Sequence, residues 1–191
     1  MKLIQKYLPN FEYREHRGTS IAVPPAKAYH SMRTLDLNDS RLIRAVFTTR
    51  RFLYGIFSKS GQVINSAEFG PLVDWVLKLG WSVLEEVPHR ELVVGAVTQP
   101  WAANVVFQGL SGPDFMAFTE PGFAKIAWNI EVHEVRPGVT RLSSETRVAL
   151  TDPVARHKFR YYWFLFNPGI RLIRWLALRM VKSDLKHQQT V

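Results

Sequence analysis

The stretch that decides the fold is ETRVALTDPVARHKF, residues 145–159, because its character changes halfway along. Its first half alternates between polar and apolar side chains and includes β-branched residues, which is typical of a strand. Asp152 is a favourable helix N-cap and Pro153 a favourable first helical residue. A helix is therefore predicted to begin where the strand ends, with almost no loop between them.

The helix that follows is predicted to be long and apolar along one side. Apolar residues recur at spacings of three and four, namely Ala155, Phe159, Tyr162, Phe166, Ile170, Ile173, Ala177 and Met180. This repeat stays in phase across Pro168, so one helix bent at Pro168 is predicted rather than two separate helices. The other side carries Arg156, Arg160, Arg171 and Arg174, which are expected to face solvent.

Upstream, residues 123–150 predict a β-hairpin whose register depends on its loop. A two-residue Pro137-Gly138 turn would mix apolar and charged side chains on both faces, whereas a three-residue loop over 136–138 separates them. The charged face would hold Lys125, Asn129, Glu131, His133, Arg141, Glu145 and Arg147. The mostly apolar face would hold Ile126, Trp128, Ile130, Val132, Leu142, Ser144, Thr146 and Val148. The three-residue loop is preferred, since a half-solvated antiparallel sheet needs one polar and one apolar face.

The remaining elements precede this hairpin. The pattern predicts a strand over 11–23, helices over 24–35, 40–56 and 68–80, and strands over 81–87 and 91–99. Residues 58–67 read as a polar loop, 104–108 as a short strand, and 114–120 as either a strand or a helical turn. These elements fit one α+β domain, with residues 54–80 as a helical insertion.

Composition narrows the class of protein. The chain has 191 residues, of which 47% are hydrophobic and 13% aromatic, enough for a folded domain with a substantial core. Cysteine is absent, which excludes disulfides and thiolate metal sites and fits a reducing cytoplasm. The first residues lack the long apolar run of a signal peptide. The most apolar stretch, residues 161–181, contains three arginines, which argues against a membrane span.

The net charge of +9 is concentrated near the C-terminus. From Asp152 onward eight lysines and arginines stand against two acids, so six of the nine surplus charges lie on the last predicted helix. Such charge attracts anionic lipid, nucleic acid or an anionic ligand, but a solvated helix face explains it more simply. No nucleic-acid reading motif accompanies it, so no nucleic-acid partner is expected, whereas peripheral contact with a membrane stays open.

The order of elements and three stretches resemble one superfamily. The stretches are SIAVPPAKAYHSMRTLDLNDSRLIRAVF (20–47), LEEVPHRELVVGAV (84–97), and EPGFAKIAWNIEV (120–132) continued by GVTRLSSETRVALTDPVARHKFRYYW (138–163). They resemble the START/SRPBCC superfamily, which includes lipid-transfer domains, plant pollen allergens, and polyketide cyclases and dehydratases. The resemblance implies the helix-grip fold, a curved antiparallel sheet wrapped around a long C-terminal helix, with a hydrophobic cavity between them.

The residues that would line this cavity follow from the two predicted apolar faces. Trp128, Ser144 and Thr146 lie on the sheet, and Phe159, Tyr162 and Phe166 lie on the helix. Apolar walls with a few hydroxyls are typical of a small-molecule site, although a filled core would use the same residues. Binding of a hydrophobic or amphipathic small molecule, such as a lipid or polyketide-like compound, is therefore the first hypothesis.

Catalytic and metal-binding patterns are weak. An enzyme of the cyclase, aromatase or dehydratase type is the second hypothesis. Its pocket would need a proton-transfer pair, for which His30 or Tyr162 is the candidate. His16 or His30 could also act as a general base, but packing or surface roles explain both histidines more simply. A lipid-transfer role at a membrane surface is the third. Glu131 and His133 have metal-pair spacing but lie on the charged face without a third ligand, so neither a metal nor a cofactor is expected. The sequence does not determine the ligand or the oligomeric state.

Overall fold

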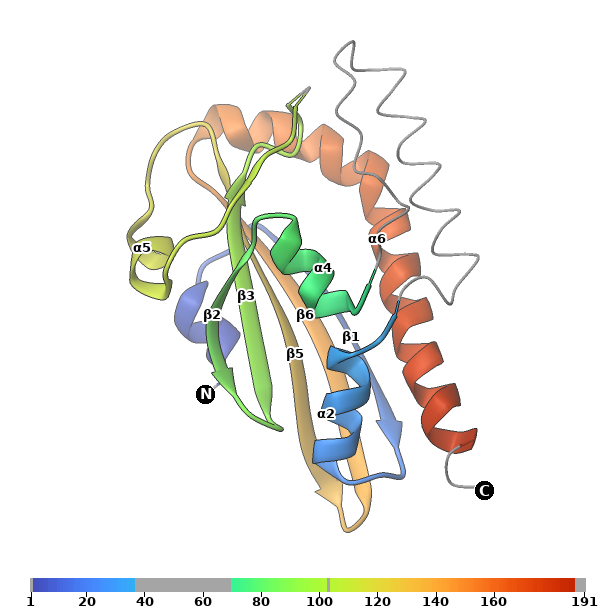
Figure 1. The fold of residues 1–191 in the computed structure, drawn as a ribbon. Helices are drawn as coiled ribbons and strands as arrows, with labels where there is room; N and C mark the ends of the chain where they lie inside the picture. The colour runs from blue at the N-terminus through green and yellow to red at the C-terminus, as the bar shows by residue number, and fades with distance from the viewer. Residues whose placement is uncertain (1, 37–69, 103, 188–191) are drawn as a thin grey trace.

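The centre of the fold is a six-stranded antiparallel sheet (Figure 1). The computed structural model describes residues 2–36, 70–102 and 104–187. The strands are β1 (Tyr13–Ile21), β2 (Ser82–Val87), β3 (Glu91–Thr98), β4 (Phe107–Gln108), β5 (Ala124–Arg136) and β6 (Val139–Leu150). They follow the order β1-β6-β5-β3-β2, and β4 pairs with β3. β5 therefore lies in the middle and β1 at one edge.

Helices cover both faces of this sheet. They are α1 (Leu3–Tyr7), α2 (Pro25–Arg33), α4 (Leu72–Lys78), α5 (Gly112–Ala117) and α6 (Pro153–His187). α2, α4 and the second half of α6 pack on the inner face and form the largest core cluster. α1 and α5 pack on the outer face around Phe115 and Val93. The predicted α+β fold of the helix-grip type, a curved sheet with a long C-terminal helix, is confirmed.

Most predicted elements are found, with shorter bounds. The helix predicted over 68–80 is α4, and Gly80 follows it with a φ of +97°. Only Phe107–Gln108 of the predicted strand over 104–108 forms, and residues 114–120 begin within a short helix. α1 was not predicted. The predicted helix over 40–56 and loop over 58–67 lie outside the described residues, so the insertion stays a prediction.

The hairpin has the predicted facing but a different tip. Trp128 lies opposite Thr146, and Val132 opposite Leu142, as predicted. Gly138 has the expected positive φ of +73°. At the tip, however, Arg136 pairs with Val139, so the turn is the two-residue one. An irregularity between Glu134 and Arg136 adds one residue to β5 and restores the predicted register, which is the role of a β-bulge.

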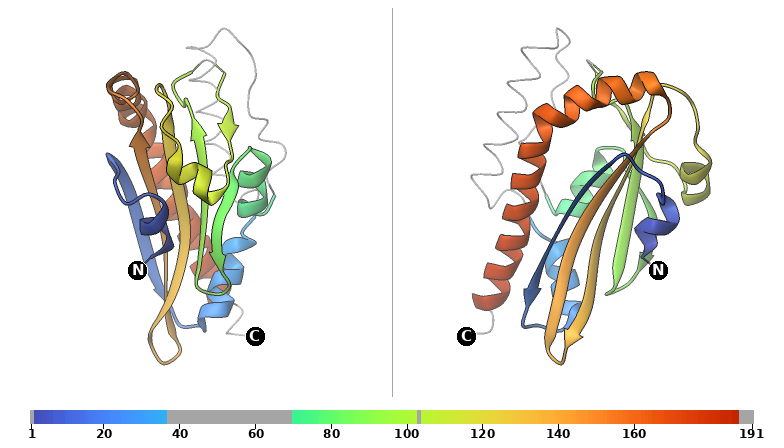
Figure 2. Two further views of the ribbon diagram at one scale, coloured as in Figure 1. Left: turned by 90° about the vertical axis from the view of Figure 1, so that its left-hand side faces the viewer. Right: turned by 180° about the vertical axis from the view of Figure 1, so that it is seen from behind.

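α6 begins and continues as predicted. The Asp152 carboxylate accepts hydrogen bonds from the backbone N–H groups of Val154 at 2.7 Å and Ala155 at 3.0 Å, which is an N-cap. The helix runs through Pro168 without a break. Figures 1 and 2 show that it bends between its first and second halves and then descends beside β1. A missing backbone N–H at Pro168 accounts for such a bend.

Part of the outer face of the sheet is buried, which corrects the prediction of a solvated face, although His133 and Arg141 on this face are exposed. Asn129 and Glu145 are each 1% exposed, and Arg147 is 5% exposed. The N-terminal segment covers them, because Ile4, Tyr7 and Leu8 pack against this face. Charged side chains that alternate with apolar ones along β5 and β6 are thus buried beneath α1.

Candidate functional site

The inner face of the sheet has a closed half and an open half. In the closed half Ile130 and Leu142 are fully buried, and Val132 is 1% exposed. In the open half, nearer the β6–α6 connection on the same two strands, Ile126, Trp128 and Thr146 remain partly exposed. Inner-face residues in the middle of a sheet keep such exposure only where solvent reaches the space above them.

The apolar stripe of α6 divides in the same way. Its beginning is packed, because Phe159 is 1% exposed and contacts Tyr13 and Trp101 with ring centroids 4.9 and 6.2 Å apart. Its end is packed in the largest core cluster, for example at Ala177. Between these ends the stripe residues are only partly buried: Tyr162, Phe166, Ile170 and Ile173. The middle of α6 is therefore partly exposed to solvent, as the open half of the sheet is.

Of the six predicted site residues, Trp128 and Thr146 lie in the open half, whereas Ser144 is 1% exposed and pairs with Ile130 at its border. The indole Nε1 of Trp128 donates a hydrogen bond of 2.7 Å to the Ser144 hydroxyl. Thr146 lies opposite Trp128 in the sheet, and its hydroxyl accepts a hydrogen bond from Arg174. Trp128, Ser144 and Thr146 thus combine one aromatic surface with hydroxyls held in defined orientations.

The three predicted site residues on α6 differ in how closely they are packed. Phe159 belongs to a packed cluster with Val148, Leu150 and Ala155. Tyr162 and Phe166 lie in the half-open middle of α6, with their ring centroids 4.8 Å apart. Ligand contact by any of the six residues stays a prediction.

Arg174 is buried, which corrects the prediction that it faces solvent. It is 8% exposed, and its guanidinium donates a hydrogen bond of 2.6 Å to the Glu15 backbone carbonyl in addition to its bond to Thr146. Burial lowers the pKa of Arg174 to about 10, although attraction to Glu15 partly opposes this. The sequence does contain an indication that Arg174 points inward, because residue 174 lies four positions after Ile170 and three before Ala177, within the apolar stripe.

Arg17 is a second cation that the sequence analysis missed. It lies on β1 opposite Ser144, and its positive charge lowers the pKa of Arg174 further. The Nε of Arg17 is buried and has no hydrogen-bond partner among the described residues. Strand alternation places Arg17 on the face of Ile21, which is a core residue, so its inward direction was readable from the sequence.

Two further polar groups border this region on α6. The Asn167 side-chain oxygen is buried without a partner among the described residues. Arg171 is 54% exposed, and its Nε lies 3.6 Å from the Glu15 carboxylate. Asn167, Arg171 and Arg174 follow one another at spacings of four and three, so α6 presents a polar row toward β1.

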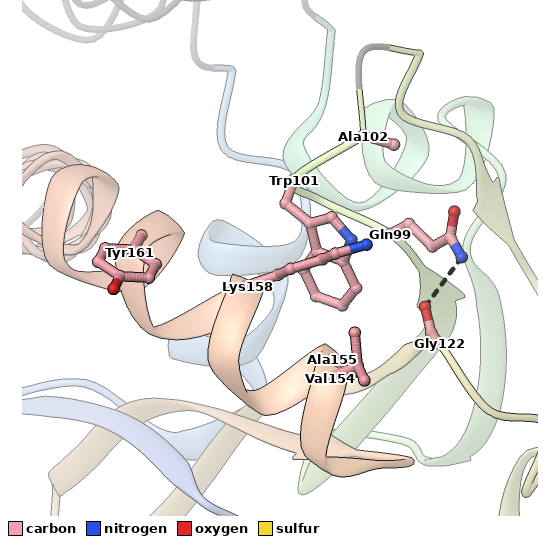
Figure 3. Close-up of a pocket in the computed structure, with 8 residues that line it drawn as sticks. All are labelled: Gln99, Trp101, Ala102, Gly122, Val154, Ala155, Lys158 and Tyr161. Atoms are coloured by element: carbon pink, nitrogen blue, oxygen red, sulfur yellow. Dashed lines mark hydrogen bonds between the residues drawn. The ribbon is translucent and has the colours of Figure 1, made fainter.

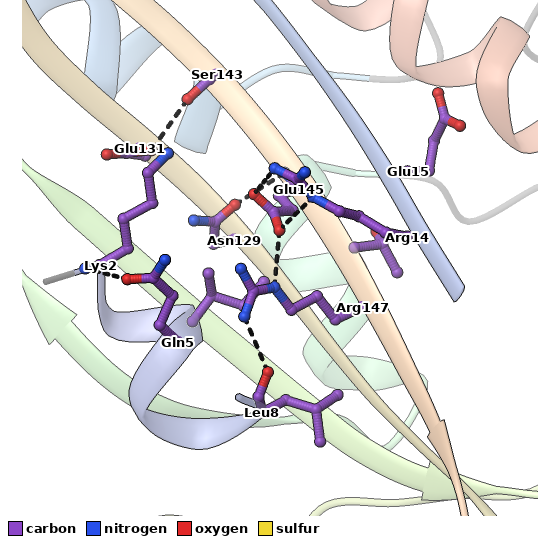
Figure 4. A network of polar contacts seen from close by, with 12 residues as sticks. Lys2, Gln5, Leu8, Arg14, Glu15, Asn129, Glu131, Ser143, Glu145 and Arg147 are labelled. Carbon is purple, nitrogen blue, oxygen red and sulfur yellow. Dashed lines mark hydrogen bonds and ion pairs between the residues drawn. The ribbon is translucent and has the colours of Figure 1, made fainter. Parts of the chain in front are cut away.

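On the outer face, a buried ionic network lies under α1 (Figure 4). The Glu145 carboxylate accepts hydrogen bonds from Arg14 at 2.8 Å and Arg147 at 2.7 Å. Burial raises the pKa of Glu145, but the hydrogen bonds from the two arginines outweigh it, so the pKa lies below its ordinary value. Glu15 points away from this network toward α6. We assign the network a structural role, since every charge in this carboxylate–arginine group is paired.

A separate pocket of about 510 Å³ lies at the first turns of α6 (Figure 3). Its wall includes Trp101, Gly122 and Lys158, and Gln99 donates a hydrogen bond of 2.9 Å to the Gly122 carbonyl. Val154 and Tyr161 on its rim are 61% and 59% exposed. The exposure of these two residues shows that the pocket is open to solvent.

The two candidate catalytic histidines and the candidate metal pair gain no support from their positions. His16 and His30 are exposed, and Glu15 and His16 point to opposite faces of β1. Glu131 is paired with Lys2 and Ser143, and His133 is exposed. Residues 2–36, 70–102 and 104–187 contain no group of three side chains suited to hold a metal ion. No helix in these ranges is long and apolar enough to cross a membrane.

Comparison with known proteins finds similarity only among solved structures. No family model and no characterised sequence matches the chain. Mll3558 from Rhizobium loti is 14% identical over 88% of this chain and 96% of that chain, with a TM-score of 0.39. The Zhui aromatase/cyclase from a Streptomyces species is 10% identical over 92% and 94%, with a TM-score of 0.29. Ara h 8.0201 is 10% identical over 87% and 98%, with a TM-score of 0.25. Similarities this weak carry no argument about ligand or reaction.

Proposed function

We propose that this protein binds a hydrophobic or amphipathic small molecule between the sheet and the middle of α6. The observation that supports this best is the open half of the inner face, where Ile126 and Trp128 keep solvent exposure in the middle of the sheet. Farther along the inner face, Ile130 on β5 and Leu142 on β6 are fully buried. A ligand would cover the apolar surface that the protein's own core leaves open.

The chemistry of this surface is that of a binding site. Ile126 and Trp128 on the sheet and Phe166 on the helix supply apolar walls. The Thr146 hydroxyl supplies an oriented polar contact, and the buried Ser144 hydroxyl orients the Trp128 indole. Small-molecule sites combine predominantly apolar linings with few placed polar groups. Of the two candidates for proton transfer, Tyr162 lies in the middle of α6, whereas His30 is exposed on α2.

Native mass spectrometry followed by organic extraction tests the proposal directly, because a bound compound adds mass and can be identified. A titration with the neutral apolar fluorophore N-phenyl-1-naphthylamine tests the position of the site. Ile126→Trp fills the open half and should weaken fluorophore binding at least tenfold. Val135→Trp is the control, because Val135 is 50% exposed near the hairpin tip. Equal binding by both variants would place the site elsewhere.

A second candidate function is exchange of this ligand at a membrane surface. Along one side of α6 five apolar residues are exposed, namely Tyr161, Phe164, Leu165, Leu172 and Trp175, with Phe164 at 86%. Arg160 lies 5.3 Å from the centre of the Tyr161 ring, and Arg179 lies 5.1 Å from that of Trp175. Aromatic residues flanked by arginines are typical of helices that lie on anionic bilayers.

Vesicle sedimentation tests this candidate. Binding to phosphatidylglycerol vesicles is expected, with a decrease as salt rises, because charge attraction is screened. Phosphatidylcholine vesicles should bind less. Phe164→Asp should abolish binding, while Val106→Asp, at a 64% exposed position on another part of the surface, should not. Equal binding to both kinds of vesicle, or unchanged binding by Phe164→Asp, would contradict the role of this side of α6.

A further inference from the structure

We propose that Arg17 and Arg174 together bind the carboxylate of an amphipathic ligand whose apolar part occupies the open half of the inner face. This inference rests on the proposed function and adds the chemical class of the ligand. It would make this part of the protein an acid-specific end of the binding site.

The two arginines approach the same part of β6. Arg17 lies opposite Ser144 in the β1–β6 pairing, and Arg174 donates to Thr146, two residues farther along β6 on the same face. Their mutual repulsion is strong enough to contribute to lowering the pKa of Arg174. Arg174 is buried and Arg17 is partly buried with a buried Nε. A buried guanidinium group beside a second cation is unfavourable without an anion, so this pair indicates an anionic binding partner.

Both guanidinium groups have donors to offer. The bonds of Arg174 to the Glu15 carbonyl and the Thr146 hydroxyl use two of the five N–H groups of a guanidinium. The buried Nε of Arg17 has no partner in the described part of the chain. A buried donor without an acceptor is costly, and a planar carboxylate is the acceptor that guanidinium groups bind in a bidentate manner.

Charge balance favours a carboxylate over a phosphate. The inner charges are Arg17 and Arg174 against Glu15, whose side chain is 12% exposed, which leaves one positive charge. Arg171 lies 3.6 Å from the Glu15 carboxylate, but because it is 54% exposed it offsets the charge of Glu15 only in part. Glu145, on the outer face, is already paired with Arg14 and Arg147. A monoanion neutralises the inner charges, whereas a phosphate dianion would leave one negative charge there.

Displacement of bound N-phenyl-1-naphthylamine by four dodecyl compounds tests the inference. Laurate is expected to bind at least tenfold more tightly than 1-dodecanol, and more tightly than dodecyl phosphate or dodecylamine. Arg174→Met and Arg17→Met should each remove the preference for laurate over 1-dodecanol, while the affinity for 1-dodecanol stays within twofold. Arg156→Met is the matched control, because Arg156 is 53% exposed at the start of α6 and should keep the preference.

The outcomes separate the two proposals. Fluorophore binding without any preference for laurate in the wild type, or a preference retained by both the Arg17→Met and Arg174→Met variants, would overturn the carboxylate site but not the proposed function. Tighter binding of dodecyl phosphate than of laurate would also overturn it. Absence of all binding by the wild type would overturn both. Thermal melts of each variant confirm folding, and the second arginine keeps the test decisive if one variant does not fold.

Discussion

Substitution of Glu145 tests the ionic network that holds the N-terminal segment on the outer face. Glu145 is 1% exposed and accepts hydrogen bonds from Arg14 and Arg147. Glu145→Gln keeps the size of the side chain but removes its charge. The substitution leaves Arg147, whose side chain is 6% exposed, as a buried cation with no carboxylate beside it. We expect a large loss of the free energy of unfolding.

The magnitude follows from the burial of the two partners. Removing one member of a buried ion pair costs about 3–5 kcal/mol. Arg14 is 47% exposed, so water can solvate its guanidinium when the carboxylate is lost. Only Arg147 then remains a buried charge without a partner. Arg147 keeps its hydrogen bond to the Leu8 carbonyl and its contact with the Phe11 ring at 4.6 Å. These remaining contacts place the expected loss at the lower end, about 3 kcal/mol.

Urea unfolding at pH 7, followed by tryptophan fluorescence, measures this loss. Glu12→Gln is the control, because Glu12 also pairs with an arginine but is 33% exposed, and it should cost less than about 1 kcal/mol. Adding Arg147→Met to Glu145→Gln should recover part of the loss, since the uncompensated cation is removed. A loss below about 1 kcal/mol for Glu145→Gln would refute the buried network.

The difference in stability between wild type and Glu145→Gln should depend on pH. The pKa of Glu145 is lower in the folded protein than its ordinary value of 4.5. Its contribution to stability is therefore present above that value and is lost as the pH falls through the folded pKa. The difference between wild type and Glu145→Gln should be largest near neutral pH and should shrink in acid. A difference that grows in acid would contradict the direction of the shift.

Three further predictions concern the helix and the hairpin. Phe159→Ala should lower the free energy of unfolding by about 3–5 kcal/mol, measured in a thermal melt, because Phe159 is tightly packed. Phe166→Ala should lower it less and should change the affinity for an apolar fluorophore, because Phe166 is only partly buried. Equal losses of stability would show that the middle of α6 is solid core. Arg160→Ala should change stability by less than about 0.5 kcal/mol, since this side chain is exposed, and a larger loss would show a buried contact. Gly138→Ala should cost about 1 kcal/mol in urea unfolding because its φ is +73°, and a neutral result would mean that the turn relaxes.

Local patterns were sufficient for the β6–α6 junction and for the facing of the hairpin. Asp152 and Pro153 act within one turn of the helix they begin, so no distant contact is needed to predict that start. The side-chain period of a strand is two, which made only one register separate the two faces. The predicted three-residue loop at the hairpin tip was wrong, because a bulge near Val135 makes a two-residue turn compatible with the same register.

Tertiary structure alone decided what covers each face. Strand alternation places Glu145 and Arg147 on one side of the sheet, but whether water or protein lies there depends on α1, a five-residue helix too short to show a period. Likewise the position of Arg174 in the apolar stripe allowed an inward direction, but charge favoured solvent. The carbonyl of Glu15 and the hydroxyl of Thr146, which are distant in sequence, supply the acceptors that allow this cation to be buried. Such acceptors come from the packing of β1 and β6 against α6, which residue spacing within any one segment does not contain.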